Sequence, residues 1–287
     1  MKWQVSVAML AVALVAVFAG AQGPTQFHPG FNLFSTEQDV QAGKEYAAEV
    51  RKQRTVINDP FLSAYVNRVG QRLVSSREAQ QSGFPFTFEV VADPSINAFA
   101  LPGGPMFIQT GLLRAVDNEA QLAGVMGHEM SHVILRHGTN QASKAQLIQL
   151  PAVLGSQLAG SSMVGQLAQL GIGLGANSVI LKFSRTAESQ ADLMGSHLMA
   201  EAGYNPLQLA AFFEKLNTEG GSRAPQFLSD HPNPDNRERA IEEEAARLPA
   251  QNYGYQTGDF ARMKQAVGRI HEKPPAPLKQ APQQQQH

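Results

Sequence analysis

The spacing of apolar and polar residues predicts a helix-rich chain with one small sheet. Helical segments are expected from about Glu37 to Gln53 and from about Pro60 to Ser75. The pattern changes between residues 86 and 110, where strand-like segments flank a Pro-Gly-Gly-Pro turn. We expect three strands there, at Phe86–Val91, Ala98–Leu101 and Met106–Thr110. Together these elements indicate a mostly helical α+β fold with a short antiparallel sheet.

Capping residues predict where several helices begin and end. Asn118 can cap a helix, with Gln121 three residues on in a variant of the capping box, and this helix should end near residues 137–138. Ser184 can cap another helix that runs to about Ala202, where a glycine follows. Asn-Pro pairs predict two further helix starts, at 205–206 and 233–234.

The first residues predict export. Lys2 is followed by an apolar run from Val5 to Phe18 and then by small residues up to Ala21. This run is shorter than the roughly 20 residues that a membrane-spanning helix needs. We therefore expect a signal peptide at residues 1–21, cleaved after Ala21, rather than an uncleaved anchor.

Two other segments have unusual composition. Residues 145–181 carry no formal charge and are rich in Gly and Gln, and their polar residues interrupt every apolar run. A helical hairpin that covers a site fits this stretch better than a membrane span, although contact with lipid stays open. Residues 272–287 are rich in Pro and Gln, so we expect a disordered tail. A single domain is expected at 22–271, with its core at about 37–248.

Composition narrows the chemistry further. The chain has no cysteine, so it has neither disulfides nor thiolate metal ligands, and any metal must be bound by His, Asp or Glu. The 23 basic and 24 acidic residues form no long run of one sign. This balance argues against a nucleic-acid-binding surface.

His128, Glu129 and His132 form the pattern HExxH within the helix that Asn118 caps. Residues four apart lie on one face of a helix, so both imidazoles can bind one Zn²⁺, while Glu129 can reach a water molecule on the metal. The motif alone is suggestive only. Its flanks are apolar, however, and two buried histidines and a glutamate would be costly without a metal.

A third ligand is expected on the helix that Ser184 caps. Glu188 and Asp192 share one face of that helix, so one can bind the metal while the other orients a histidine. Asp192 is the natural acceptor for the second N–H of a ligand histidine. Arg185 can pair with these carboxylates, and an ordinary Glu188–Arg185 salt bridge is the alternative interpretation.

The remaining histidines differ in their expected roles. His137 and His197 each lie nine residues from a proposed ligand, about 180° round the helix, so we expect them to be surface or capping residues. His231 lies in the loop segment Ser-Asp-His-Pro-Asn-Pro. It could donate to a developing oxyanion, act as a removable fourth zinc ligand, or be an ordinary turn residue.

Four motifs in this order resemble zinc metallopeptidase family 48, which includes HtpX and the CAAX prenyl proteases. They are NAFALPGG at 97–104, HEMSH at 128–132, ESQAD at 188–192 and DHPNP at 230–234. Without several membrane helices, the chain looks most like the exported, BepA-like bacterial branch, and we expect a member of it without the helical repeat domain of those relatives. The resemblance covers roughly residues 37–248.

This resemblance implies a zincin-type domain with one Zn²⁺ per chain. The implied ligands are His128, His132 and Glu188, and Glu129 is the implied base. The segment that begins at Asn97 resembles the edge strand that lines the substrate cleft, so the implied substrate-binding residues are Asn97, Ala98, Phe99 and Ala100.

The first functional hypothesis is a zinc endopeptidase that hydrolyses unfolded or misassembled envelope proteins. It would be exported to the periplasm, where it could attach peripherally to a membrane surface. The alternative is a non-proteolytic chaperone or assembly factor for envelope proteins, with the sheet edge and the charge-free segment as binding surfaces. Polypeptides are the expected substrates, and partner proteins stay unknown.

Overall fold

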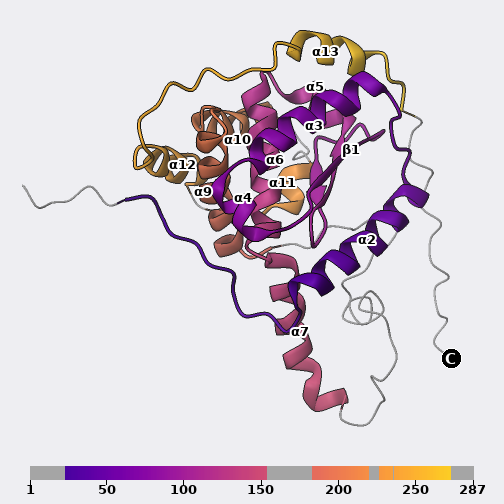
Figure 1. Cartoon of the computed structure of the whole chain (residues 1–287), viewed down its shortest axis with the longest axis vertical. Coiled ribbons are helices and arrows are strands. Elements are labelled where there is room, and N and C mark those ends of the chain that lie inside the picture. Colours follow the sequence, from indigo (N-terminus) through magenta and orange to yellow (C-terminus); the bar gives the residue numbers. More distant parts are fainter. Residues whose placement is uncertain (1–22, 154–182, 220–225, 235, 273–287) are drawn as a thin grey trace, which may run out of the picture.

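The computed structural model describes residues 23–153, 183–219, 226–234 and 236–272. The predicted signal peptide, the predicted tail from residue 273 on and residues 154–182 of the charge-free segment lie outside the described residues. The rest is mostly helical with one small sheet (Figure 1). Its elements are α2 (Thr36–Gln53), α3 (Pro60–Val74), α4 (Arg77–Ser82), β1 (Thr87–Val91), β2 (Ala98–Ala100), β3 (Pro105–Gln109), α5 (Thr110–Ala115), α6 (Glu119–Ile134), α7 (His137–Val153), α9 (Arg185–Glu201), α10 (Leu207–Glu219), α11 (Gln226–Asp230), α12 (Arg237–Ala245) and α13 (Phe260–Gly268).

The predicted caps form at the two helices that matter most for the site. The side chain of Asn118 accepts a hydrogen bond from the Gln121 N–H at the start of α6. Ser184 accepts one from the Ala187 N–H at the start of α9. These bonds satisfy backbone donors that the first turn of a helix leaves without intrahelical partners. Both predicted helix starts are therefore confirmed.

The predicted end of α6 is wrong by three residues. The helix ends at Ile134, because Arg136 adopts a left-handed conformation with φ of 56°. This is the conformation that commonly stops a helix, but glycine usually provides it. A second helix, α7, starts at His137. The break changes the direction of His137, which has consequences for the site.

The sheet is mixed rather than antiparallel. Its strand order is β1-β3-β2, with β2 antiparallel to β3 and β1 parallel to β3. The turn at 101–104 joins β2 and β3 as a hairpin, as predicted. The antiparallel prediction is wrong for β1, since β3 inserts between the first two strands. Alternation of apolar residues reports which face is buried, not strand direction.

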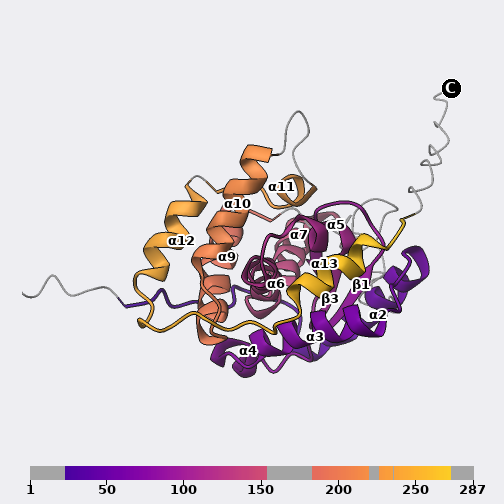
Figure 2. The same cartoon turned by 90° about the horizontal axis from the view of Figure 1, so that it is seen from above.

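Both faces of the sheet are covered. Phe88, Val90 and Ile108 belong to the main core with residues of α3 and α6, whereas Phe99 and Phe107 belong to a second cluster with residues of α2. Successive strand residues point to opposite faces, which explains why every residue of β3 is buried. On the side of α6 away from the sheet lie α9, α10 and α12 (Figure 2).

Glycines let α6 and α9 approach closely. A Cβ atom added at Gly195 would lie 3.0 Å from the backbone nitrogen of His128, and one at Gly127 would lie 3.2 Å from the carbonyl oxygen of Gly195. Side chains larger than hydrogen at this crossing would push the helices apart. The close approach places Glu188 and Asp192 opposite the two histidines of α6.

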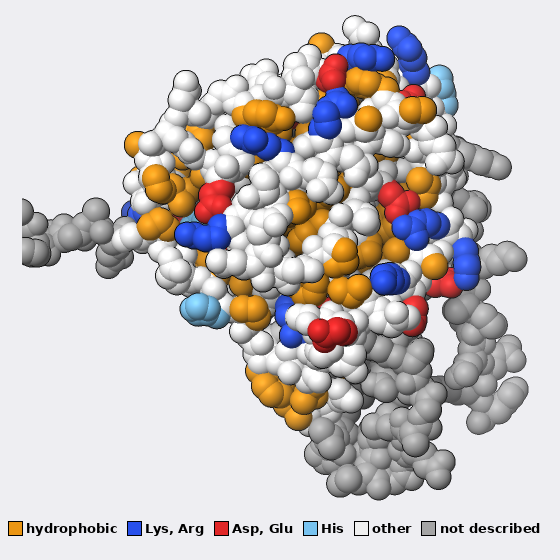
Figure 3. Space-filling model, viewed as in Figure 1, with side chains coloured by type: hydrophobic (Ala, Val, Ile, Leu, Met, Phe, Trp, Pro, Cys, Tyr) orange, Lys and Arg blue, Asp and Glu red, His pale blue; other side chains and the backbone are white. Residues whose placement is uncertain are grey.

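The described surface carries mixed charge. On the face shown in Figure 3, Lys and Arg side chains lie among Asp and Glu side chains rather than in one area. Among the described helices, none combines the length and apolar character needed to cross a bilayer. Helix α7 extends away from the body beside α2 and contains the first residues of the charge-free segment (Figure 1).

Candidate metal centre

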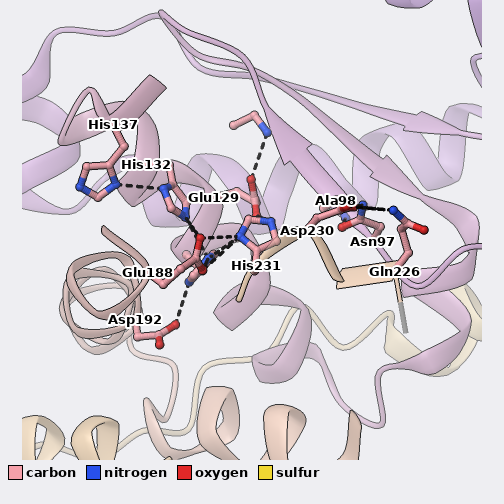
Figure 4. A network of polar contacts seen from close by, with 12 residues as sticks. Asn97, Ala98, Glu129, His132, His137, Glu188, Asp192, Gln226, Asp230 and His231 are labelled. Atoms are coloured by element: carbon pink, nitrogen blue, oxygen red, sulfur yellow. Dashed lines mark hydrogen bonds and ion pairs between the residues drawn. The ribbon is translucent and has the colours of Figure 1, made fainter. Parts of the chain in front are cut away.

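Four potential metal ligands from three parts of the chain meet in the interior. His128 and His132 come from α6, Glu188 comes from α9, and His231 follows α11 (Figure 4). One donor atom from each lies within 4.8 Å of all the others, and all four residues are buried. The structure therefore brings together the HExxH histidines, the predicted carboxylate and the loop histidine.

The spacing of the donor atoms fits a single cation. His128 Nε2 lies 3.1 Å from His132 Nε2, 3.2 Å from His231 Nδ1 and 3.4 Å from Glu188 Oε2. One ring nitrogen carries at most one proton, so it cannot donate to all three neighbours. In a tetrahedral zinc site the ligand atoms would lie about 3.3 Å apart, since each bond is about 2.0–2.1 Å long. The residues present fit one such ion.

Asp192 orients His128. Its Oδ1 atom lies 2.8 Å from His128 Nδ1, and its two oxygens accept hydrogen bonds of 3.0 and 2.7 Å from Arg237 Nε and Nη2. Arg237 is itself buried and lies 3.9 Å from Glu188 Oε2. A carboxylate at this position keeps a proton on Nδ1, which leaves Nε2 as the nitrogen that can bind a metal.

Burial and the contacts between neighbouring side chains together set the protonation of the cluster. It disfavours the charged form of His128, but the Asp192 and Glu188 carboxylates outweigh this effect and raise its pKa to about 9. Burial lowers the pKa of His132 well below its usual value. Although burial opposes charge on Glu188 too, hydrogen bonds to His128 and His231 lower its pKa. At neutral pH Glu188 is thus ionised and His132 is neutral, which are the forms that bind metals, whereas His128 is protonated and must release the proton on Nε2 when a metal binds.

Glu129 lies between the ligand cluster and the sheet. Its Oε2 atom accepts a 3.1 Å hydrogen bond from the Ala100 N–H of β2, and its Oε1 atom lies 3.2 Å from His231 Nε2. Burial is the main cause that raises the pKa of Glu129 above its usual value. The carboxylate is therefore held beside the cluster without being one of the four converging ligands.

The outer edge of β2 faces this carboxylate. The backbone groups of Asn97 and Leu101 pair with β3, so those of Ala98 and Ala100, which alternate with them, point the other way. The Ala100 N–H donates to Glu129, as noted above. Strand β2 is an edge of the sheet, with no further strand beside it in the described part of the chain.

Asn97 connects β2 to the segment that carries His231. Its side-chain amide donates to Asp230 Oδ2 over 2.9 Å, and Gln226 donates to the same carboxylate (Figure 4). His231 lies in a loop, as expected, directly after α11, and its backbone N–H donates to the Phe227 carbonyl. Its ring also stacks on Phe227. This support holds the imidazole in place.

The predictions for Arg185 and two histidines need correction. Arg185 is exposed in the first turn of α9, and the arginine beside Asp192 and Glu188 is Arg237, which no local pattern in its polar helix marks.

His137 and His197 are buried rather than at the surface. His197 contacts Glu244 of α12 over 2.7 Å. His137 contacts His132, because the break at Arg136 ends the helical geometry assumed for it.

The mostly helical fold, the active-site helix and the buried His/Glu donor set define a zincin-type metallopeptidase domain. The family model for Peptidase family M48 matches residues 60–245, and the chain belongs to this family. The matched range contains the whole donor set. The resemblance read from the motifs is thus confirmed.

Curated relatives agree with this assignment. The chain is 36% identical over 214 residues to the beta-barrel assembly-enhancing protease of Escherichia coli. The aligned region covers 72% of this chain and 43% of that protein. It is 34% identical to the protein of the same name from Yersinia pestis, with 71% and 43% covered. It is 32% identical to the mitochondrial metalloendopeptidase OMA1 of Schizosaccharomyces pombe, with 62% and 52% covered. The chain thus spans about half, or less, of the length of these relatives.

Proposed function

We propose that this protein is a zinc-dependent endopeptidase that cleaves unfolded or misassembled polypeptides. The observation that carries the proposal is the set of four donor atoms that lie within 4.8 Å of one another, with a buried carboxylate beside it that is not a member of the set. Membership of Peptidase family M48 supports the same reaction. His128, His132 and Glu188 would hold the ion, and Asp192 with Arg237 would keep His128 oriented.

Zinc is favoured by the donor chemistry, since two imidazoles and one carboxylate form a common catalytic zinc set. When bound, it would supply Lewis-acid polarisation of a peptide carbonyl and a lowered pKa for water. Glu129 would take the proton from the attacking water and pass it to the leaving amine. The raised pKa of Glu129 suits this role, because a group that first accepts and then donates a proton is most efficient when its pKa lies near the working pH.

Substrate binding is proposed at the outer edge of β2. An extended peptide can add to such an edge through backbone hydrogen bonds, here with Ala100 and the Ala98 carbonyl, while Asn97 and Phe99 anchor the strand to its neighbours. The Ala98 N–H already donates to the Asn97 side chain. A peptide bound there would lie next to Glu129, because the Ala100 N–H is already within hydrogen-bond distance of that carboxylate. Backbone recognition is largely independent of side chains and requires an extended chain. It therefore suits unfolded substrates.

The proposed setting is the bacterial envelope. The Escherichia coli and Yersinia pestis relatives are named for enhancing beta-barrel assembly, and residues 1–21 have the layout of a signal peptide. We infer an exported, periplasmic enzyme whose substrates are envelope proteins, with peripheral attachment to a membrane surface as a further option.

His231 is proposed as a removable fourth ligand. Its Nδ1 atom lies 3.2 Å from both His128 Nε2 and Glu188 Oε1, so it belongs to the donor set. Its other nitrogen contacts Glu129, the proposed base. An imidazole bound in this way would occupy the place that water and substrate need, and it would engage the base as well. Activity would then require His231 to move away.

Changing His231 to Ala tests this arrangement. The variant should digest casein faster than the wild type, because the fourth position is open and Glu129 is free. Both activities should stop when a chelator removes the metal and return with added zinc, which tests the proposed function itself. Digestion that a chelator does not affect would contradict the proposed function. Lost activity in the variant with zinc retained would instead favour a role for His231 as oxyanion donor.

A further inference from the structure

A second imidazole lies directly behind one of the proposed ligands. The left-handed residue Arg136 turns the chain, so that His137, the first residue of α7, points back toward α6. His137 Nδ1 lies 2.9 Å from His132 Nδ1, and both rings are buried. In Figure 4, His137 lies on the side of His132 that is away from Glu188 and His231.

The contacts of these two rings determine which nitrogen of each ring carries the hydrogen. His132 faces the donor set with Nε2, which is 3.1 Å from His128 Nε2 and 3.6 Å from Glu188 Oε1. A neutral imidazole that offers a lone pair at Nε2 carries its proton on Nδ1. His137 must then accept that proton at its own Nδ1 and carry its own hydrogen on Nε2. That nitrogen lies 3.2 Å from Gln190 Oε1, which can accept it.

The surroundings hold this chain of contacts in place. The ring of Phe183 stacks on His132 with centroids 4.1 Å apart and an angle of 17° between the planes. Arg136, which provides the turn, donates to Asp39 over 2.6 Å and to the Phe34 carbonyl over 2.5 Å. A left-handed conformation costs an L-residue about 1–2 kcal/mol. These side-chain contacts stabilise the turn where a glycine would ordinarily occur.

We propose that Gln190 and His137 are positioning residues, which set the tautomer and orientation of His132 for metal binding. This inference rests on the proposed function. His128 and His132 would then be oriented in different ways. A carboxylate held by Arg237 accepts from His128, whereas a neutral imidazole held by an amide accepts from His132. Groups that accept from the second N–H of a ligand histidine raise metal affinity in this way.

Zinc affinity of His137 variants, measured by competition with a chromophoric chelator, tests the proposal. His137→Leu keeps the bulk but removes the acceptor, and it should weaken zinc binding about 10- to 100-fold. His137→Asn places a carbonyl oxygen near the position of Nδ1, so it should restore most of the affinity. His197→Leu is the matched control, because it removes another buried imidazole, which contacts Glu244 rather than a ligand. Its zinc affinity should equal that of the wild type.

Histidine NMR of the zinc-loaded wild type provides a second readout that does not depend on a variant folding. Proton–nitrogen correlations should place the hydrogen of His132 on Nδ1 and that of His137 on Nε2. A His137 hydrogen on Nδ1, or equal zinc affinity in the wild type and His137→Leu, would overturn the positioning role of His137 and Gln190 but not the proposed function. A wild type that binds no zinc would overturn the proposed function, and with it the positioning role of His137 and Gln190.

Discussion

Replacement of Glu129 by glutamine should end proteolysis while the metal stays bound. A general base contributes about 10²- to 10⁴-fold to a reaction rate, so kcat should fall by that factor. Glutamine has nearly the same shape, and its carbonyl oxygen can still accept from the Ala100 N–H. It cannot take a proton from water, however. Packing is therefore conserved and only the proton transfer is lost.

The measurement compares casein digestion and zinc content in the wild type, Glu129→Gln and Glu243→Gln. Glu243 is exposed on α12 and serves as the matched control, which should behave as the wild type. The same comparison decides between the two functional hypotheses in cells. If Glu129→Gln retains the full cellular phenotype of the wild type, the chaperone or assembly-factor hypothesis is favoured instead.

Replacement of Arg237 by leucine should cause a large loss of stability. The Arg237 guanidinium makes two hydrogen bonds to Asp192, and its Cζ atom lies 3.6 Å from the centroid of the Phe213 ring. Without it, the buried Asp192 carboxylate keeps only its contact with His128, and a nearby positive charge is lost to Glu188. Removal of one partner of a buried ion pair costs about 3–5 kcal/mol.

Urea denaturation of the zinc-loaded proteins measures this cost. Arg239→Leu is the matched control on the same helix, because Arg239 pairs with Glu243 at the surface with 78% of its side chain exposed. Its free energy of unfolding should change by no more than about 0.5 kcal/mol. Equal stability of the two variants would show that Arg237 does not support the site.

The parts of the molecule that could be predicted depend on local signals. Caps at Asn118 and Ser184 set the starts of α6 and α9, and the four-residue spacing placed His128 with His132 and Glu188 with Asp192. Local geometry also predicted that Asp192 could orient a ligand histidine, and the structure shows that this histidine is His128. For the caps and the two pairs, the residues concerned lie within about one turn of the same helix.

The parts that could not be predicted depend on contacts between distant segments. The parallel pairing of β1 with β3 follows from strand order, which alternation does not record. His137 was misplaced because a non-glycine residue, Arg136, ends the helix with support from α2. Arg237 carries no signal in its own polar helix, and only the folded chain places it beside Asp192. Packing between segments distant in sequence therefore determines which residues, such as His137 and Arg237, surround the proposed metal ligands.

The metal content of the purified protein tests the central claim most directly. Elemental analysis of protein from zinc-supplemented cells should find one zinc per chain in the wild type. Glu188→Ala should bind far less, because the three remaining ligands leave the ion without its carboxylate. A purified, folded wild type that contains no transition metal and takes up none on dialysis against zinc would contradict the claim that these side chains form a metal centre.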